Sequence, residues 1–254
     1  MSHQRRKLLD RLLLVARVDD EKNCSWELLT DCLEIVAVAE GLKPSHLQGH
    51  GMRSQPITDG LRGVATLHHL ETLETRPLAI SRPRPGRQDF EILMTRHERE
   101  VATSNDESVL WIFKNPELPV AIRRATETPG GVAAVLGYPA CCIMEYDERL
   151  LDAEEEFMRR LREEHGAASR EDFERLIEAD VVVQCDALDA DMGQALATRV
   201  VFPFVQFTAC QACTRSCHSE AARMNSQMKS LAMRLGRGFH DAIEEAALEF
   251  EREE

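Results

Sequence analysis

The sequence predicts an α+β fold that is predominantly helical, with a small central sheet from the middle of the chain. Two observations lead to this prediction. Most segments place apolar residues three or four positions apart, as one face of a helix requires, whereas short apolar runs bounded by turn residues gather between residues 77 and 113. Of the 254 residues, 43% are hydrophobic and 30% are charged, which is the composition of a globular protein that buries its own core.

The first third of the chain reads as mainly helical. We expect helices over residues 5–17 and 25–40, a loop over 43–63 and a short helix over 64–75. Ser25 is a suitable N-cap for the second helix, and Gly41 is a suitable residue to end it. The loop is predicted because residues 43–63 contain several Gly, Ser and Pro residues.

Three apolar runs are the predicted strands, at residues 77–81, 89–94 and 108–113. The first two are separated by a basic, proline-containing stretch at residues 82–87. Because proline cannot donate to a strand ladder, this stretch is predicted as a loop. A solvated connection is favoured there over a phosphate or substrate clamp.

The remainder of the chain returns to a helical pattern. We expect interrupted helices over residues 118–135, a long helix over 140–164 that Pro139 opens, and a final helix over 218–252 that breaks near 236–238. The chain divides into an N-terminal helical region, residues 1–75, and a cysteine-bearing α+β domain, residues 76–254, unless the two form one continuous domain.

Charge and cysteine content narrow the classes of partner. Residues 1–125 are close to neutral, so the net charge of -13 lies in the second half, which would repel a phosphate backbone. We therefore disfavour nucleic acid and expect any protein partner to bind the acidic C-terminal half. No apolar run is long enough to cross a membrane, and the basic N-terminus does not lead into a signal peptide. A cytoplasmic location follows as the prediction, with the eight cysteines as thiols or metal ligands.

The densest chemistry is a Cys-x-x-Cys-x-x-x-Cys array formed by Cys210, Cys213 and Cys217. Such compact spacing lets three sulfurs converge on one centre, as in iron–sulfur proteins. Tetrahedral zinc is the competing ligand, because Cys-x-x-Cys turns serve it equally well. The isolated Cys24, Cys32 and Cys185 are instead interpreted as core residues.

Cys141 and Cys142 directly follow Pro139, which places both in the first turn of the predicted long helix. A helix N-terminus favours the thiolate form that binds metal. Adjacent side chains on a helix diverge by about 100°, so one of the pair is expected to ligate and the other to act. We expect the metal ligands to be Cys142, Cys210, Cys213 and Cys217, with Cys141 as a catalytic acid, base or nucleophile.

The motif Leu-Gly-Tyr-Pro-Ala-Cys-Cys at residues 136–142 is followed by Pro-Phe-Val at 203–205 and by Cys213-x-x-x-Cys217-x-Ser219. This pattern resembles an uncharacterised prokaryotic domain family, marked by a Gly-Tyr-Pro-x-Cys-Cys motif and a later Pro-Phe segment with Cys-x-x-x-Cys near a serine. The resemblance covers roughly residues 105–225. It implies that the two cysteine motifs act together, and it implies no particular activity.

Two further side chains beside the array are interpreted as functional. His218 is expected to orient a sulfur or donate a proton, and Arg215 to stabilise cluster charge or bind an anionic substrate. The favoured function is an iron–sulfur enzyme, in which the open iron of a [4Fe-4S] cluster carries out sulfur-transfer or lyase-type chemistry on a small molecule or sulfur donor. The alternatives are a zinc-stabilised protein-interaction module and a metal-free thiol oxidoreductase that uses Cys210 and Cys213.

Overall fold

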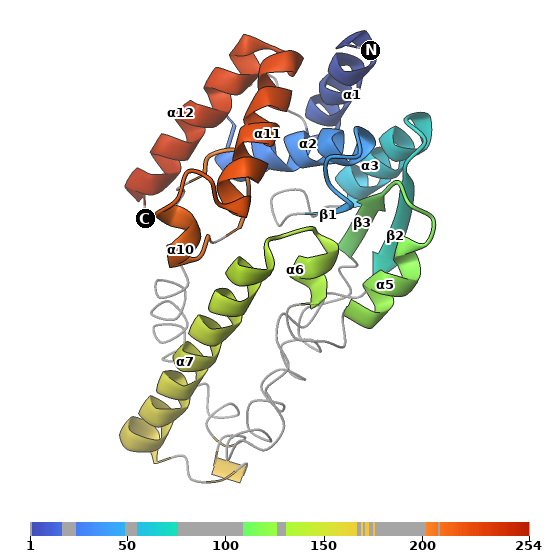
Figure 1. The fold of residues 1–254 in the computed structure, drawn as a ribbon. Coiled ribbons are helices and arrows are strands. Elements are labelled where there is room, and N and C mark those ends of the chain that lie inside the picture. Colours follow the sequence, from blue (N-terminus) through green and yellow to red (C-terminus); the bar gives the residue numbers. More distant parts are fainter. Residues whose placement is uncertain are drawn as a thin grey trace.

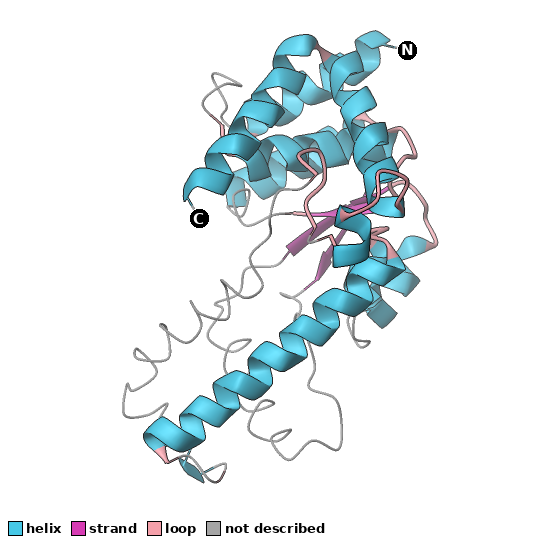
Figure 2. Ribbon diagram, turned by 60° about the vertical axis from the view of Figure 1, so that its left-hand side comes forward, coloured by secondary structure: helices cyan, strands magenta, loops and turns pink. Residues whose placement is uncertain are grey.

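The structure is a computed structural model in which the helices surround a small sheet (Figure 1). It describes residues 2–16, 24–48, 55–75, 109–125, 131–166, 202–207 and 209–253, together with residues 169, 171, 172 and 175. The predicted fold class is confirmed, because the described part of the chain is predominantly helical with one three-stranded antiparallel sheet (Figure 2). The predicted strands at 77–81 and 89–94, the basic loop at 82–87 and Cys185 lie outside the described residues.

The elements follow one another in a mixed order along the chain. The helices are α1 (Ser2–Val15), α2 (Trp26–Ala39), α3 (Gln55–Leu67), α5 (Leu118–Ala125), α6 (Gly131–Val135), α7 (Ala140–His165), α10 (Gln211–Thr214), α11 (Glu220–Leu235) and α12 (Arg237–Glu253). The strands are β1 (Ser45–Leu47), β2 (Glu71–Thr75) and β3 (Val109–Phe113). The predicted long helix after Pro139 is α7, and the predicted break near residues 236–238 separates α11 from α12.

Helix α2 shows why its sequence-based boundaries were correct. The Ser25 side chain accepts the backbone N–H of Leu28 at 3.3 Å, as an N-cap should. At the other end, Gly41 adopts a φ of +73°, and the N–H of Leu42 donates to the carbonyl of Ala37 at 2.8 Å. This glycine-dependent ending satisfies carbonyls that the helix itself leaves unpaired.

The sheet has the strand order β1-β3-β2, with both pairs antiparallel. All five residues of the central strand β3 are buried because helices cover both faces of the sheet. Leu110 and Ile112 point into the main core, whereas Trp111 and Phe113 pack against residues of α5 and the α6 end. Alternate side chains of a strand point to opposite faces, so one short strand joins two clusters.

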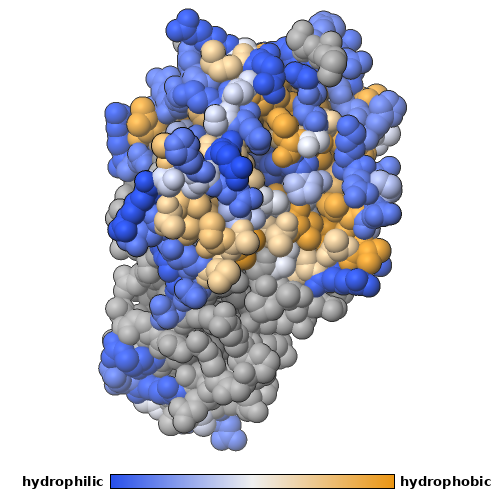
Figure 3. Space-filling model, in the orientation of Figure 1, coloured by the Kyte–Doolittle hydropathy of each residue, from blue (hydrophilic) through white to orange (hydrophobic). Residues whose placement is uncertain are grey.

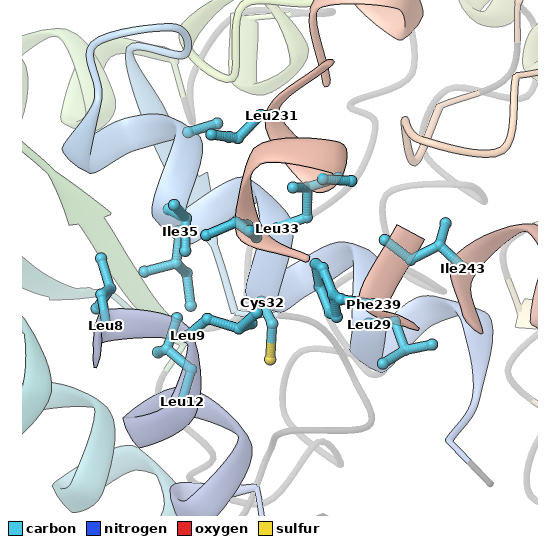
Figure 4. Close-up of a cluster of buried hydrophobic side chains, with 14 of the residues drawn as sticks. Leu8, Leu9, Leu12, Leu29, Cys32, Leu33, Ile35, Leu231, Phe239 and Ile243 are labelled. Atoms are coloured by element: carbon cyan, nitrogen blue, oxygen red, sulfur yellow. The ribbon is translucent and has the colours of Figure 1, made fainter. Parts of the chain in front are cut away.

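The main core brings the first and last helices of the chain together (Figure 4). Its labelled members come from α1, α2, α11 and α12: Leu8, Leu9, Leu12, Leu29, Cys32, Leu33, Ile35, Leu231, Phe239 and Ile243. Cys32 is fully buried among them, and the partly buried Cys24 packs against the same core. The core role predicted for these two cysteines is therefore confirmed.

The predictions for residues 43–75 were wrong in detail. The described residues within 43–63 include β1 and most of α3 where a loop was predicted, and residues 64–75 form the end of α3 followed by β2 instead of a helix. Composition misled here because Gly60 has a packing role. A Cβ at Gly60 would lie 2.7 Å from a Val15 methyl group, so glycine lets α3 approach α1 closely.

On the face drawn in Figure 3, apolar patches cross the middle of the described part and hydrophilic residues border them. Large exposed apolar side chains include Leu14, Val120, Met144 and Met233. Within α11, Met228 is buried in the main core whereas Met233 is 49% exposed. None of the described helices combines the length and apolar character needed to cross a bilayer.

Candidate metal centre

The start of α7 is fixed by two special backbone positions. Gly137 has a φ of +81°, and a Cβ there would lie 2.8 Å from Cδ of Pro44. The Pro139 carbonyl then accepts the N–H groups of Cys142 at 2.9 Å and Ile143 at 3.1 Å. The proline therefore opens the helix, and both adjacent cysteines lie in its first turn, as predicted.

A remote segment, residues 202–207, is bound to the same region. The Trp26 indole N–H donates to the Pro203 carbonyl at 2.7 Å, which ties the segment to α2. The Tyr138 hydroxyl donates to the Gln206 carbonyl at 3.1 Å, and the Tyr138 ring lies 4.9 Å from the Phe207 ring, centroid to centroid. These contacts hold the segment beside Tyr138. Cys210, which comes three residues after the segment, therefore lies close to the start of α7.

The start of α10 completes this junction. Cys210 is the N-cap residue of α10, and its N–H donates to the Cys142 sulfur at 3.4 Å. The next N–H, from Gln211, donates to both carboxylate oxygens of Glu145 at 2.9 and 3.1 Å. Side chains from the first turns of α7 thus cap α10, so the position of Cys210 depends on α7.

The start of α11 positions Cys213. Ser219 is the N-cap of α11, since its side chain accepts the N–H of Ala222 at 3.1 Å, and its hydroxyl also donates to the Cys213 carbonyl at 3.1 Å. The Ala221 N–H donates to the Cys213 sulfur. Cys213 therefore lies at a helix N-terminus, where the partial positive charge stabilises a thiolate.

Four sulfurs meet where these helix ends converge. The Sγ atoms of Cys141, Cys142, Cys210 and Cys213 all lie within 4.8 Å of one another, and the Cys141 and Cys213 sulfurs are 3.5 Å apart. We call these four residues the cysteine group. Four sulfurs at 2.3 Å from one tetrahedral ion would be about 3.8 Å apart, so the group fits a single metal ion.

The thiols interact strongly even without a cation. Desolvation and the contacts with the Cys213 and Cys210 sulfurs raise the pKa of Cys141 to about 11. Burial raises the pKa of Cys142 above its ordinary value, although the Cys210 N–H opposes this. Burial also acts against ionisation of Cys213, but the Ala221 N–H and the three other thiols outweigh it and lower its pKa. The protein alone therefore ionises Cys213 more easily than Cys141 or Cys142, whereas four thiolates would require a bound cation.

The structure brings together three of the four expected ligands. Cys142, Cys210 and Cys213 are buried in the group, whereas Cys217 is exposed and lies outside it. Cys141, expected to act beside the metal, contributes the fourth sulfur. Rotation about χ1 lets two adjacent cysteines direct their sulfurs to one point although their Cβ atoms diverge.

The other two expected site residues lie on the connection between α10 and α11. Arg215 and His218 are both exposed there. The backbone N–H of His218 donates to the Ser216 hydroxyl at 3.3 Å. The expected roles of Arg215 and His218 therefore stay predictions, attached to the loop next to the cysteine group.

A second polar assembly lies in the interior, between α2 and β1. Asp31, Glu34, Lys43 and His46 are each at most 3% exposed, and we call them the charge cluster. The Lys43 ammonium lies 2.7 Å from Glu34, and His46 Nδ1 lies 3.1 Å from the other Glu34 oxygen. His46 Nε2 faces Asp31 at 3.8 Å, which is an ion-pair distance and exceeds a hydrogen bond.

The two carboxyl groups of the charge cluster differ in protonation. Burial is the largest influence on Asp31 and raises its pKa to about 7. Glu34 is equally buried, but Lys43 and His46 overcome the desolvation and hold its pKa at about 2. The cluster contacts the region of the cysteine group through Tyr138, because the Lys43 ammonium lies 5.0 Å from the centre of the Tyr138 ring.

A further set of possible ligands on α12 is better explained without metal. His240, Asp241 and Glu244 have ligand atoms close to one another. However, the Lys229 ammonium already pairs with Glu244 at 2.7 Å, and the His240 ring stacks on Phe204 with a centroid distance of 5.1 Å. A cation in the same place would compete with Lys229.

Sequence reasoning missed three contributors to this region. Glu145, Ala221 and the charge cluster were not identified. Glu145 and the Ala221 N–H give no sequence signal, because their roles depend on where α10 and α11 begin. The charge cluster did have a sequence signal. Asp31 and Glu34 share a face of an otherwise apolar helix, and buried carboxylates require partners.

No family model, curated protein or solved structure matches the chain. The functional assignment therefore rests on the geometry of the described residues.

Proposed function

We propose that the chain binds one zinc ion through Cys141, Cys142, Cys210 and Cys213, and that the ion stabilises a protein-interaction module. The observation that carries this proposal is the convergence of four sulfurs within 4.8 Å. The first turn of α7 and the α10 turn supply the sulfurs, and the N–H groups of Cys210 and Ala221 point at two of them. Amide donors of this kind offset the negative charge of a zinc tetrathiolate.

The spacing of the sulfurs supports a single ion over an iron–sulfur cluster. In a [4Fe-4S] cluster each thiolate binds a different iron atom and points outward, so the sulfurs stand roughly 6 Å apart. The 3.5 Å between the Cys141 and Cys213 sulfurs is much closer to the spacing around one tetrahedral ion. The [4Fe-4S] enzyme favoured by the sequence is accordingly the second hypothesis.

Four protein ligands leave a tetrahedral ion without an open position, which favours a structural role over Lewis-acid catalysis. The ion would join the start of α7 to α10 and α11, which are 68 or more residues further along the chain. We propose a basic protein surface as the partner, because the second half of the chain holds the excess negative charge. A reducing compartment such as the cytoplasm would keep the thiols available, and membership of the Gly-Tyr-Pro-x-Cys-Cys family is part of the same proposal.

Metal analysis of the purified protein tests the proposal. The chain is purified without chelators under anaerobic conditions, and zinc, iron and acid-labile sulfide are measured per chain. We expect about one zinc, a colourless protein and no sulfide, because the group fits a single ion. A brown protein with about four irons and sulfide would establish the cluster instead.

Cysteine variants then identify the ligands. Cys213→Ser should abolish stoichiometric zinc binding, because it removes the sulfur that contacts the other three. Cys217→Ser is the matched control, since Cys217 is an exposed cysteine four residues away and outside the group. If Cys217→Ser lost the metal while Cys141→Ser kept it, the ligand set expected from the sequence would replace the one proposed here.

The same preparation tests the metal-free alternative. A thiol oxidoreductase would contain no stoichiometric metal and would form a reversible disulfide between Cys210 and Cys213 under mild oxidation. Mass spectrometry after alkylation of the remaining thiols detects that bond. Its formation in a metal-free protein would overturn the zinc proposal.

A further inference from the structure

The four members of the cysteine group differ in accessibility. Cys142, Cys210 and Cys213 are 2%, 3% and 4% exposed, whereas Cys141 is exposed to solvent. A reagent that approaches from solution would therefore meet Cys141 before the other three cysteines. The three buried sulfurs are shielded by the protein and by one another.

The sulfurs also differ in their hydrogen bonds. The Cys142 sulfur accepts the Cys210 N–H, and the Cys213 sulfur accepts the Ala221 N–H. The contacts that the structure records for the Cys141 sulfur are with sulfurs of the cysteine group, including Cys213 at 3.5 Å. An amide donor withdraws electron density from a thiolate, so a metal-bound thiolate without one is the better nucleophile.

The surroundings of Cys141 favour an uncharged reagent. Met144 follows Cys141 by one helical turn, lies on the same face of α7 and is 64% exposed. Four thiolates and one zinc ion carry a net charge of about -2, which repels anions. An apolar neighbour and a negative centre together suit a neutral, soft carbon electrophile.

We propose that Cys141 is a metal-activated nucleophile that accepts an alkyl group from a neutral carbon electrophile, an inference that rests on the zinc site proposed above. The Cys141 sulfur lone pair forms the new carbon–sulfur bond, and the bond to the leaving group breaks with its electron pair. No oxidant is consumed. The product is a thioether, so the charge of the centre changes from about -2 to about -1 and one metal–sulfur bond weakens.

Iodoacetamide and iodoacetate are the probes, and iodide is the leaving group for both. Zinc-loaded protein is treated with each reagent at pH 8 and pH 6.5, and peptide mass spectrometry follows the modification of each cysteine. Zinc is measured in the same samples before and after the reaction. Cys217 serves as the internal reference, because it is exposed, lies near the centre in sequence and is outside the cysteine group.

We expect Cys141 to react with iodoacetamide at rates that differ less than about threefold between the two pH values, because zinc keeps it a thiolate. An ordinary unligated thiol slows about twentyfold over that interval, since only its thiolate fraction reacts. Iodoacetate should react with Cys141 at least several-fold more slowly than iodoacetamide. Cys141→Ser should remove the pH-insensitive reaction and leave the reaction at Cys217.

Zinc-containing protein in which Cys141 stays unmodified, or slows in step with Cys217 as the pH falls, would overturn the inference while leaving the zinc site intact. Failure of the zinc site itself is recognised separately, by the metal content measured before the reagent is added. Cys217→Ser protein excludes transfer of the alkyl group between neighbouring cysteines, because it should show the same modification at Cys141.

Discussion

The cysteine group and the charge cluster both gather ionisable side chains from separate segments of the chain, but they balance charge in different ways. The charge cluster contains its own cation, since Lys43 lies 2.7 Å from Glu34 and Asp31 has its pKa raised to about 7. The members of the cysteine group are all potential anions. A buried polar assembly that includes a lysine balances a carboxylate charge internally, whereas one built only from thiols would gain its positive charge by binding a metal ion.

The largest expected effect on stability comes from removing the Lys43 ammonium of the charge cluster. Lys43→Met should lower the free energy of unfolding by roughly 3–5 kcal/mol at pH 7, because it leaves the Glu34 carboxylate buried without its closest partner. Denaturation in urea measures the change. Lys229→Met is the matched control, since Lys229 forms an equally short but exposed pair with Glu244, and its loss should cost less than about 1 kcal/mol. Equal costs for the two variants would contradict the distinction.

A smaller effect on stability is expected from removing the proposed zinc ion. Transfer into excess chelator should lower the free energy of unfolding by about 3 kcal/mol, relative to protein with free zinc at a hundred times the Kd. The loss would arise because the proposed zinc ion would bind the folded state, in which the cysteine group is assembled. Cys210→Ser should show no zinc-dependent difference in thermal unfolding, whereas Lys43→Met should keep the full difference. A chelator effect in Cys210→Ser as large as that in the parent protein would place the zinc elsewhere.

The smallest expected effect is a dependence on pH. The folded pKa of Asp31 is about 7 and its ordinary value is 3.8, so between these values the folded state holds a proton that the unfolded state has released. Stability should therefore fall as the pH rises, by about 2 kcal/mol between pH 5 and pH 7, and level off above pH 7. Glu34, with a pKa of about 2, contributes the opposite slope only below about pH 4.5.

Asp31→Asn tests this dependence in metal-free protein, where zinc-linked proton release from the cysteine group does not contribute. Urea unfolding at pH 5, 6 and 7 should show a flatter profile for the variant than for the parent. Parallel profiles would mean that Asp31 in the folded protein does not hold its proton between pH 5 and pH 7.

The two regions also differ in how far the sequence predicted them. Local signals are strong for the cysteine group, because a proline-led cysteine pair and a Cys-x-x-Cys turn have few alternative explanations. Its exact membership was less predictable. The direction of the Cys141 sulfur depends on its side-chain rotamer, and that of Cys217 depends on the α10 turn and on the Ser219 cap. Spacing along the chain encodes neither direction.

Elements of the fold also differ in how well the sequence predicted them. Helices α2, α7, α11 and α12 were predicted because caps, glycines and periodicity agree in each. The region of β1 and α3 was not predicted, because Gly60 was interpreted as a loop residue. In the structure Gly60 lies in α3, where the missing side chain allows close contact with Val15. Nor does the sequence show that the 3-residue strand β1 pairs with β3, more than 60 residues later, because such pairing depends on tertiary packing.

Helix α7 begins at two members of the cysteine group and extends away from the three-stranded sheet (Figure 1). Its 26 residues give it a length of about 39 Å. A tilt of about 10° at the base of a straight helix of that length would displace its far end by about 7 Å. Loss or alkylation of a single ligand at the base would thereby be amplified into a movement large enough for a neighbouring molecule to detect.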